Sequence, residues 1–275
     1  MKIDKRKIIQ LTTAVIYNLN FYGFKNANIY NGPIKKLCVP GLNCYSCPGA
    51  IAACPLGSFQ NFIMQKKGPI GVITRFPFYI LGLIILFGVI FGRVVCGFLC
   101  PFGLYQEILY KIRTKKVKKN IITKNLTIIK YIILIIFAVF IPIIYHYPAF
   151  CKFICPAGTL EAGIFHISAN DNLRQLVGAL FNLKLSILIL LSISSIFIYR
   201  TFCRFICPLG AIYCFFNKYA ILGLQIDDTK CTKCNKCINT CLMDVKRVGD
   251  KECIQCGKCI KKCHVNAIYR LKSYK

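Results

Sequence analysis

The C-terminal part of the chain contains the cysteine-rich sequence CTKCNKCINTCLMDVKRVGDKECIQCGKCIKKC at residues 231–263. It contains two runs in which three cysteines are separated by two residues each and a fourth follows after three more. Protein zinc sites use two pairs of ligands, whereas thiol runs with this spacing bind [4Fe-4S] clusters. The stretch therefore predicts two iron–sulfur clusters rather than a zinc site.

In two-cluster bacterial ferredoxins the fourth cysteine of each run binds the cluster of the other run. The predicted ligand sets are Cys231, Cys234, Cys237 and Cys263 for one cluster and Cys253, Cys256, Cys259 and Cys241 for the other. The proline that usually follows the fourth cysteine is replaced by Leu242 and by His264, and ligation does not need it. We expect a small α+β two-cluster ferredoxin domain over residues 223–275.

Upstream of this tail, the tetrapeptide Cys-Pro-x-Gly occurs four times, at residues 54–57, 100–103, 155–158 and 207–210. Three of the four are preceded by a further cysteine four residues earlier, at Cys96, Cys151 and Cys203. Proline suits the first turn of a helix, and glycine lets the backbone approach a bulky cofactor. The repeat predicts thiol ligands at the start of helices.

Each repeat follows an apolar segment. Residues 76–91, 126–145 and 183–199 contain no Asp or Glu, and residues 8–24 form a weaker segment interrupted by Gln10, Thr12, Thr13, Asn18 and Asn20. The mean hydropathy of +0.56 is above what soluble folds carry, so some of the surface is expected to face lipid. Because a helix of about 20 apolar residues crosses the hydrocarbon layer, residues 1–222 predict an all-α domain of four transmembrane helices in two tandem repeats. The first segment lacks a signal-peptide cleavage site and is expected to remain as a helix.

The chain carries 37 Lys and Arg against 9 Asp and Glu, and the basic residues are unevenly spread. The loop at 111–124 holds seven of them, whereas 146–182 holds only Lys152 and Arg174. Basic loops stay in the cytoplasm, so we expect a multi-pass protein of the cytoplasmic membrane with both termini inside. The loop at 25–75, with six basic residues, fits this topology least well. The basic run has no interleaved aromatic residues, so nucleic acid is not an expected partner.

If the helices alternate in direction, the cysteine groups alternate between the two faces of the membrane. The inner group is Cys96, Cys100, Cys203 and Cys207, and the preferred outer group is Cys47, Cys54, Cys151 and Cys155. The outer side also has Cys38 and Cys44, so a local set within 38–54 and a disulfide between remaining thiols stay open. Arg93, Arg204 and Lys152 are expected to favour the thiolate forms.

The motifs GRVVCGFLCPFG at 92–103 and YRTFCRFICPLGAIY at 199–213, together with the tail, resemble those of the membrane-bound polyferredoxins. That family includes the nitrate-reductase accessory ferredoxins and related regulators. The resemblance implies a four-helix membrane anchor that exchanges electrons with soluble redox proteins. The outer motifs NCYSCPGAIAACPLG and FCKFICPAG depart from the nitrate-type members, so their link to quinol is not carried over.

These features predict an electron carrier, or a subunit of an oxidoreductase complex, with no catalytic residue of its own. It would relay electrons between the cytoplasmic tail clusters and one or two membrane-domain clusters, and passage across the membrane would extend this relay. The expected partner is a soluble redox donor or acceptor, with quinone and an exported oxidoreductase left open. The alternative is an assembly or metal-reductase factor, because the surplus thiols of Cys38 and Cys44 suit Cu(I).

Cys214 is expected to be a packing residue, and Glu107 and Glu161 to be interface or capping residues.

Overall fold

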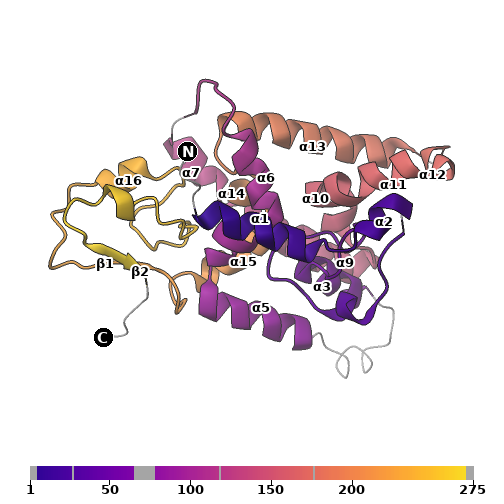
Figure 1. Ribbon diagram of the computed structural model, residues 1–275, viewed down its shortest axis with the longest axis horizontal. Helices are drawn as coiled ribbons and strands as arrows, with labels where there is room; N and C mark the ends of the chain where they lie inside the picture. The colour runs from indigo at the N-terminus through magenta and orange to yellow at the C-terminus, as the bar shows by residue number, and fades with distance from the viewer. Residues whose placement is uncertain (1–4, 27, 65–77, 118, 176, 271–275) are drawn as a thin grey trace.

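The computed structural model describes residues 5–26, 28–64, 78–117, 119–175 and 177–270. Helices make up the larger part of the chain, and a small domain with two strands occupies one end of the long axis (Figure 1). The α-helices are α1 (Lys5–Tyr17), α2 (Phe21–Asn26), α3 (Pro55–Ile63), α5 (Phe78–Phe91), α6 (Pro101–Leu109), α7 (Ile121–Leu126), α8 (Ile129–Ile133), α9 (Ile141–Tyr145), α10 (Pro156–Gly158), α11 (Ile164–Ala169), α12 (Asp171–Gln175), α13 (Ala179–Phe197), α14 (Thr201–Phe205), α15 (Pro208–Phe216) and α16 (Lys236–Thr240). The 3₁₀ turns are η1 (Pro33–Lys36) and η6 (Ile260–Lys262), and the π-helical segments are η2 (Val95–Leu99), η3 (Leu134–Phe140), η4 (Phe150–Ile154) and η5 (Thr159–Gly163).

The four Cys-Pro-x-Gly repeats have one local structure. In each, the cysteine is the N-cap residue and the proline begins a helix, namely α3, α6, α10 and α15. Proline fits this position because the first N–H of a helix has no intrahelical partner. The π-helical segments η2 and η4 run directly into Cys100 and Cys155, and such widened turns often occur at functional sites.

The apolar segments form helices of different lengths. Among the described residues, two helical stretches are long and apolar enough to cross a membrane, Thr123–Tyr145 with 23 residues and Ala179–Phe197 with 19. At about 1.5 Å per residue they are roughly 34 and 28 Å long. Helix α5 has 14 residues, and positions 76 and 77 of its predicted segment lie outside the described residues.

The expected first span, residues 8–24, is not one helix. Helix α1 ends at Tyr17 and α2 begins at Phe21. The Asn18 side chain donates to the Ala14 carbonyl and to Asn43 Oδ1, at 3.0 and 3.1 Å. Asparagine competes with the helical backbone for hydrogen bonds, and here it ties the end of α1 to a cysteine-rich loop.

The tail is closed by strands β1 (Leu224–Ile226) and β2 (Ile268–Arg270), which pair antiparallel with Leu224 opposite Arg270. Both cysteine runs lie between these strands in the sequence, so the pairing joins the two ends of the cysteine-rich segment. Between the strands the chain forms the short helix α16 and the 3₁₀ turn η6.

The core lies between the cysteine motifs. Phe102, Phe150, Phe202 and Tyr213 are almost completely buried and belong to one apolar cluster that also contains buried cysteines of the helical domain and the tail. The cysteine motifs are therefore the packing centre of the molecule rather than its periphery.

Candidate metal centres

The tail cysteines surround two cavities. One, of about 260 Å³, is lined by Cys231, Cys234, Cys237 and Cys263. The other, of about 30 Å³, is lined by Cys241, Cys253, Cys256 and Cys259. Each cavity takes three thiols from one run and the fourth from the other, which is the crossed grouping that the spacing predicts.

The inner group of the helical domain consists of Cys96, Cys100, Cys203 and Cys207, all buried. Burial raises the pKa of the Cys100 thiol, and the neighbouring Cys203 and Cys96 thiols raise it further. Burial likewise raises the pKa of Cys207, again with Cys203 and Cys96 adding to the effect. Two hydrogen bonds point at these sulfurs, from Gln106 Nε2 to Cys203 Sγ at 3.1 Å and from Gly210 N to Cys207 Sγ at 3.3 Å. The four thiols therefore share one buried site.

Two arginines accompany the inner group, and both are fully buried. Arg93 donates to the Cys203 carbonyl at 3.3 Å, and Arg200 donates to the Cys96 carbonyl at 2.5 Å. Their charges favour thiolate over thiol. Arg200 was not singled out from the sequence, although a signal exists: both arginines stand three residues before the first cysteine of their motif.

Glu107 neutralises part of this positive charge. Its carboxylate accepts from Arg200 Nε at 2.9 Å, from Arg6 Nη1 at 2.8 Å and from the Tyr199 hydroxyl at 2.6 Å. Burial alone would raise the pKa of Glu107, but Arg200 and Arg6 lower it to about 2. This residue, expected to be an interface or capping residue, is the anionic centre of a buried ion-pair network next to the inner site.

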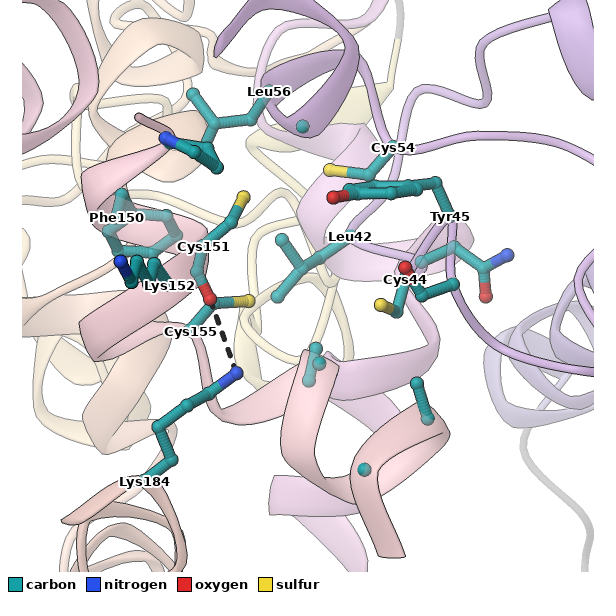
Figure 2. Close-up of a pocket in the computed structure, with 18 of the residues that line it drawn as sticks. Leu42, Cys44, Tyr45, Cys54, Leu56, Phe150, Cys151, Lys152, Cys155 and Lys184 are labelled. Atoms are coloured by element: carbon teal, nitrogen blue, oxygen red, sulfur yellow. Dashed lines mark hydrogen bonds between the residues drawn. The ribbon is translucent and has the colours of Figure 1, made fainter. Parts of the chain in front are cut away.

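The outer cavity, of about 410 Å³, is lined by four thiols from two separate parts of the chain: Cys44, Cys54, Cys151 and Cys155. Figure 2 shows their side chains arranged around a common space. Lys184 donates to the Cys151 carbonyl at 3.3 Å, the dashed contact in the figure. The cavity therefore contains Cys44 where the sequence interpretation preferred Cys47.

The two remaining outer thiols lie elsewhere. Cys47 Sγ donates to Asn18 Oδ1 at 3.6 Å and lines a different cavity with that asparagine. Cys38 Sγ donates to Ser58 Oγ at 3.5 Å. Cys44 and Cys47 are the ends of a turn in which Cys47 N donates to the Cys44 carbonyl at 3.1 Å, and their side chains line different cavities. All 19 cysteines lie within the described residues, and all are free thiols, so the structure contains no outer disulfide.

The inner and outer groups are neighbours. The backbone N–H of Leu42 lies beside the Cys100 sulfur, and that of the next residue, Asn43, lies beside the Cys54 sulfur. Consecutive Cα atoms are about 3.8 Å apart, whereas the hydrocarbon layer is about 30 Å thick. The expectation that these groups lie at opposite membrane faces is therefore wrong. It assumed that each motif sits at the end of a full span, but the loop before α3 brings both groups together.

The tail contacts the inner group directly. A Cβ atom on Gly97, the residue after Cys96, would lie 2.3 Å from the Ile254 carbonyl oxygen, so only glycine permits this approach. Glu252 accepts from Arg93 at 2.9 Å and from Lys130 at 2.7 Å, and Asn217 Nδ2 donates to the Cys253 carbonyl at 3.0 Å. The smaller tail cavity therefore adjoins the inner site.

The donor sets fit clusters better than single ions. Among the described residues, no three His, Cys, Asp or Glu side chains lie close enough together to hold one metal ion. A single zinc ion would need all its sulfurs at about 2.3 Å from one point. The outer thiols instead surround a cavity, and glycines face its sulfurs: a Cβ on Gly158 would lie 3.7 Å from Cys44 Sγ. This arrangement suits a bulky iron–sulfur cofactor.

Comparison with known families and proteins agrees with this chemistry. The family described as "4Fe-4S binding domain" matches the chain three times, at residues 76–120, 129–174 and 183–224. Each match contains one Cys-x3-Cys-Pro motif, while Cys44, Cys54 and the tail cysteines lie outside all three. No solved structure matches the chain significantly.

Two proteins of Methanocaldococcus jannaschii are similar to this chain. The uncharacterized protein MJ0750 is 32% identical over 200 residues, which is 70% of this chain and 74% of that protein. The uncharacterized protein MJ0749 is 29% identical over 198 residues, 70% of this chain and 65% of that protein. The narrower resemblance to polyferredoxins of the nitrate-reductase type remains a prediction. The chain is a 4Fe-4S binding protein with multiple clusters, and it belongs to the family that includes MJ0750.

Proposed function

We propose that this protein is a membrane-anchored electron carrier that relays electrons between its ferredoxin tail and its helical domain. The observation that carries this proposal is the continuous series of four four-cysteine groups: two in the tail, then the inner group, then the outer group. A [4Fe-4S] cluster, when bound, supplies a one-electron carrier at each group. The chain's own residues set the spacing between them.

Two backbone contacts hold neighbouring groups close. Gly97 lets the Ile254 carbonyl approach the inner motif, and the peptide between Leu42 and Asn43 lies between the inner and outer groups. Tyr213 is fully buried near Cys96 and Cys54, and its hydroxyl donates to the Pro40 carbonyl at 2.9 Å. These residues exclude water from the route and fix its length.

The membrane anchor is supported by the exposure of the long helices. The most apolar 18 residues of the candidate span Thr123–Tyr145 are only 22% buried within the molecule, and those of Ala179–Phe197 only 17%. A core helix of a soluble protein would be mostly buried. Large apolar side chains such as Leu190, 66% exposed, and Ile144, 61% exposed, would face lipid.

The proposed orientation, with the tail in the cytoplasm, agrees with the position of the basic loop. Lys119 in this loop donates to the Ile238 carbonyl of the tail, and Thr123 Oγ1 donates to Asp244 at 3.1 Å. At the start of α1, Arg6 donates to the Gly97 carbonyl at 3.2 Å, on the side of the inner motif that the tail contacts. The basic loop, the tail and the start of α1 therefore lie at one end, as expected if that end is cytoplasmic.

A soluble redox partner would dock at the larger of the two tail cavities, which is lined by Cys231, Cys234, Cys237 and Cys263. Cys234 is exposed there, and Lys233, Lys236 and Lys246 line the same cavity. Such a cluster of positive charge attracts an acidic surface and speeds the encounter at low ionic strength. The proposed partner is an acidic electron carrier.

The relay is tested by removing the middle group. The double variant Cys100→Ser/Cys207→Ser, purified anaerobically in detergent, should keep its tail clusters and outer cluster. After stoichiometric reduction of the tail, rapid-freeze spectroscopy should show the outer site reduced quickly in the wild-type protein and at least tenfold more slowly in the variant. Equal rates would refute the relay. Release of the wild-type protein from membranes by alkaline carbonate would refute the anchor.

The alternative of a copper-reducing or assembly factor gains no support from the structure. It depended on Cys38 and Cys44 as a pair of surplus thiols. In the structure Cys44 lines the outer cavity, whereas Cys38 is hydrogen-bonded to Ser58.

A further inference from the structure

We propose that Cys44, Cys54, Cys151 and Cys155 are the four ligands of a [4Fe-4S] cluster in the outer cavity, with Cys44 rather than Cys47 as the fourth ligand. The family match covers Cys151 and Cys155 but stops short of the other two. The assignment concerns where the cofactor is held, and it does not depend on the proposed relay.

The first support is the convergence of these thiols. Cys151 has the thiols of Cys155, Cys54 and Cys44 as neighbours. Cys44 in turn lies near Cys155 and Cys54. The members of the proposed set therefore approach one another, whereas the Cys47 sulfur is directed to Asn18.

The second support is the packing of two motif glycines against sulfurs of the other segment. A Cβ on Gly57 would lie 3.8 Å from Cys151 Sγ, and one on Gly158 would lie 3.7 Å from Cys44 Sγ. Gly57 belongs to the repeat that contains Cys54, and Gly158 belongs to the repeat that contains Cys155. Each glycine therefore contacts a sulfur of the other segment, and the two segments interlock around the cavity. A larger side chain at either position would occupy space that a cluster needs.

The third support is the charge around the cavity. Lys184 belongs to α13, a candidate membrane span, and its ammonium group donates to the Cys151 carbonyl near the Cys155 thiol. Ionisable side chains within membrane spans pair with opposite charges or with backbone carbonyls, and Lys184 contacts such a carbonyl. A cluster held by four thiolates carries net negative charge and would add an anionic partner beside it. Lys152 also lines the cavity.

The fourth support is a set of backbone N–H groups beside the Cys54 sulfur, those of Gly57, Leu56 and Asn43. N–H donors to sulfur are a normal part of iron–sulfur sites. The loop geometry before α3 and the first turn of α3 supply these donors.

The experiment compares Cys44→Ser with the matched control Cys47→Ser in the full chain, purified anaerobically. Iron, acid-labile sulfide and the electron paramagnetic resonance spectrum of the reduced protein are measured. Four occupied sites give about 16 iron atoms per chain, four for each cluster. Cys44→Ser should lower the count by one to four iron atoms and change one spectral component, while the tail signals stay unchanged and show that the protein is folded.

Cys47→Ser should keep the wild-type iron content and spectrum. This control decides the question even if Cys44→Ser does not accumulate, because a ligand role for Cys47 predicts loss of iron from that variant. Loss of iron in Cys47→Ser, or a Cys44→Ser protein with the full iron content and spectrum, would overturn the assignment. Either result would leave the relay through the remaining sites to be judged by its own kinetic test.

Discussion

The ion pairs of Glu252 join the tail to the helical domain, and they predict that Glu252→Gln loosens this junction. Glu252 is 3% exposed and accepts from Arg93 at 2.9 Å and Lys130 at 2.7 Å, and both cations are 0% exposed. The substitution leaves two buried positive charges without a carboxylate. Breaking a buried pair by removing one partner costs about 3–5 kcal/mol, which is roughly a 10²- to 10⁴-fold change in an equilibrium constant.

The effect should appear at the docking of the tail, because Glu252 precedes Cys253, whose carbonyl accepts from Asn217. The assay is native-state proteolysis of the anaerobic holoprotein over a urea series, following release of the tail. The matched control is Asp228→Asn, which removes a pair with Arg247 whose side chains are 76% and 60% exposed. This exposed pair is expected to contribute less than about 1 kcal/mol. Equal effects of the two substitutions would show that Glu252 does not hold the tail in place.

Three further substitutions test separate parts of the structure. Gly97→Val should displace the tail, because even a Cβ there would lie 2.3 Å from the Ile254 carbonyl oxygen. We expect the variant to keep its full iron content and to transfer electrons from the tail more slowly. An unchanged rate would contradict the close approach. Cys207→Ala should remove up to about four iron atoms while the tail spectrum is kept, and an unchanged iron content would exclude Cys207 as a ligand. Leu190→Lys, on an exposed side of α13, should weaken membrane insertion by about 3–4 kcal/mol, measured as the fraction resistant to carbonate extraction. Full resistance would argue against lipid contact at this position.

The cysteine groups of the tail and the inner site could be predicted because their spacing is regular. Each repeat places its thiols at the same kind of helix start, and the alternation of the repeats along the chain groups the second with the fourth. The choice between Cys44 and Cys47 could not be made this way. They are three residues apart in an irregular loop, and a single turn decides which of them faces the cavity.

The sequence also did not show how close the inner and outer cysteine groups lie to each other. Hydropathy marks apolar segments but not where the chain folds back, and Gly41 packs against the Leu99 carbonyl in a contact between residues 58 positions apart. That contact places the loop before α3 beside Cys100. The buried arginines could have been found, since Arg93 and Arg200 occupy the same position in their motifs. Their carboxylate partners, Glu252 for Arg93 and Glu107 for Arg200, give no comparable signal in the sequence.

Whether the helical domain holds clusters is tested by the quantity of cluster iron in the full chain, measured by Mössbauer spectroscopy after anaerobic production with ⁵⁷Fe. Thiols of the helical domain that ligate iron as proposed give about 16 iron atoms per chain, all in [4Fe-4S] clusters. A value of about eight, assigned to the two tail clusters, would contradict the claim that the helical domain holds clusters of its own.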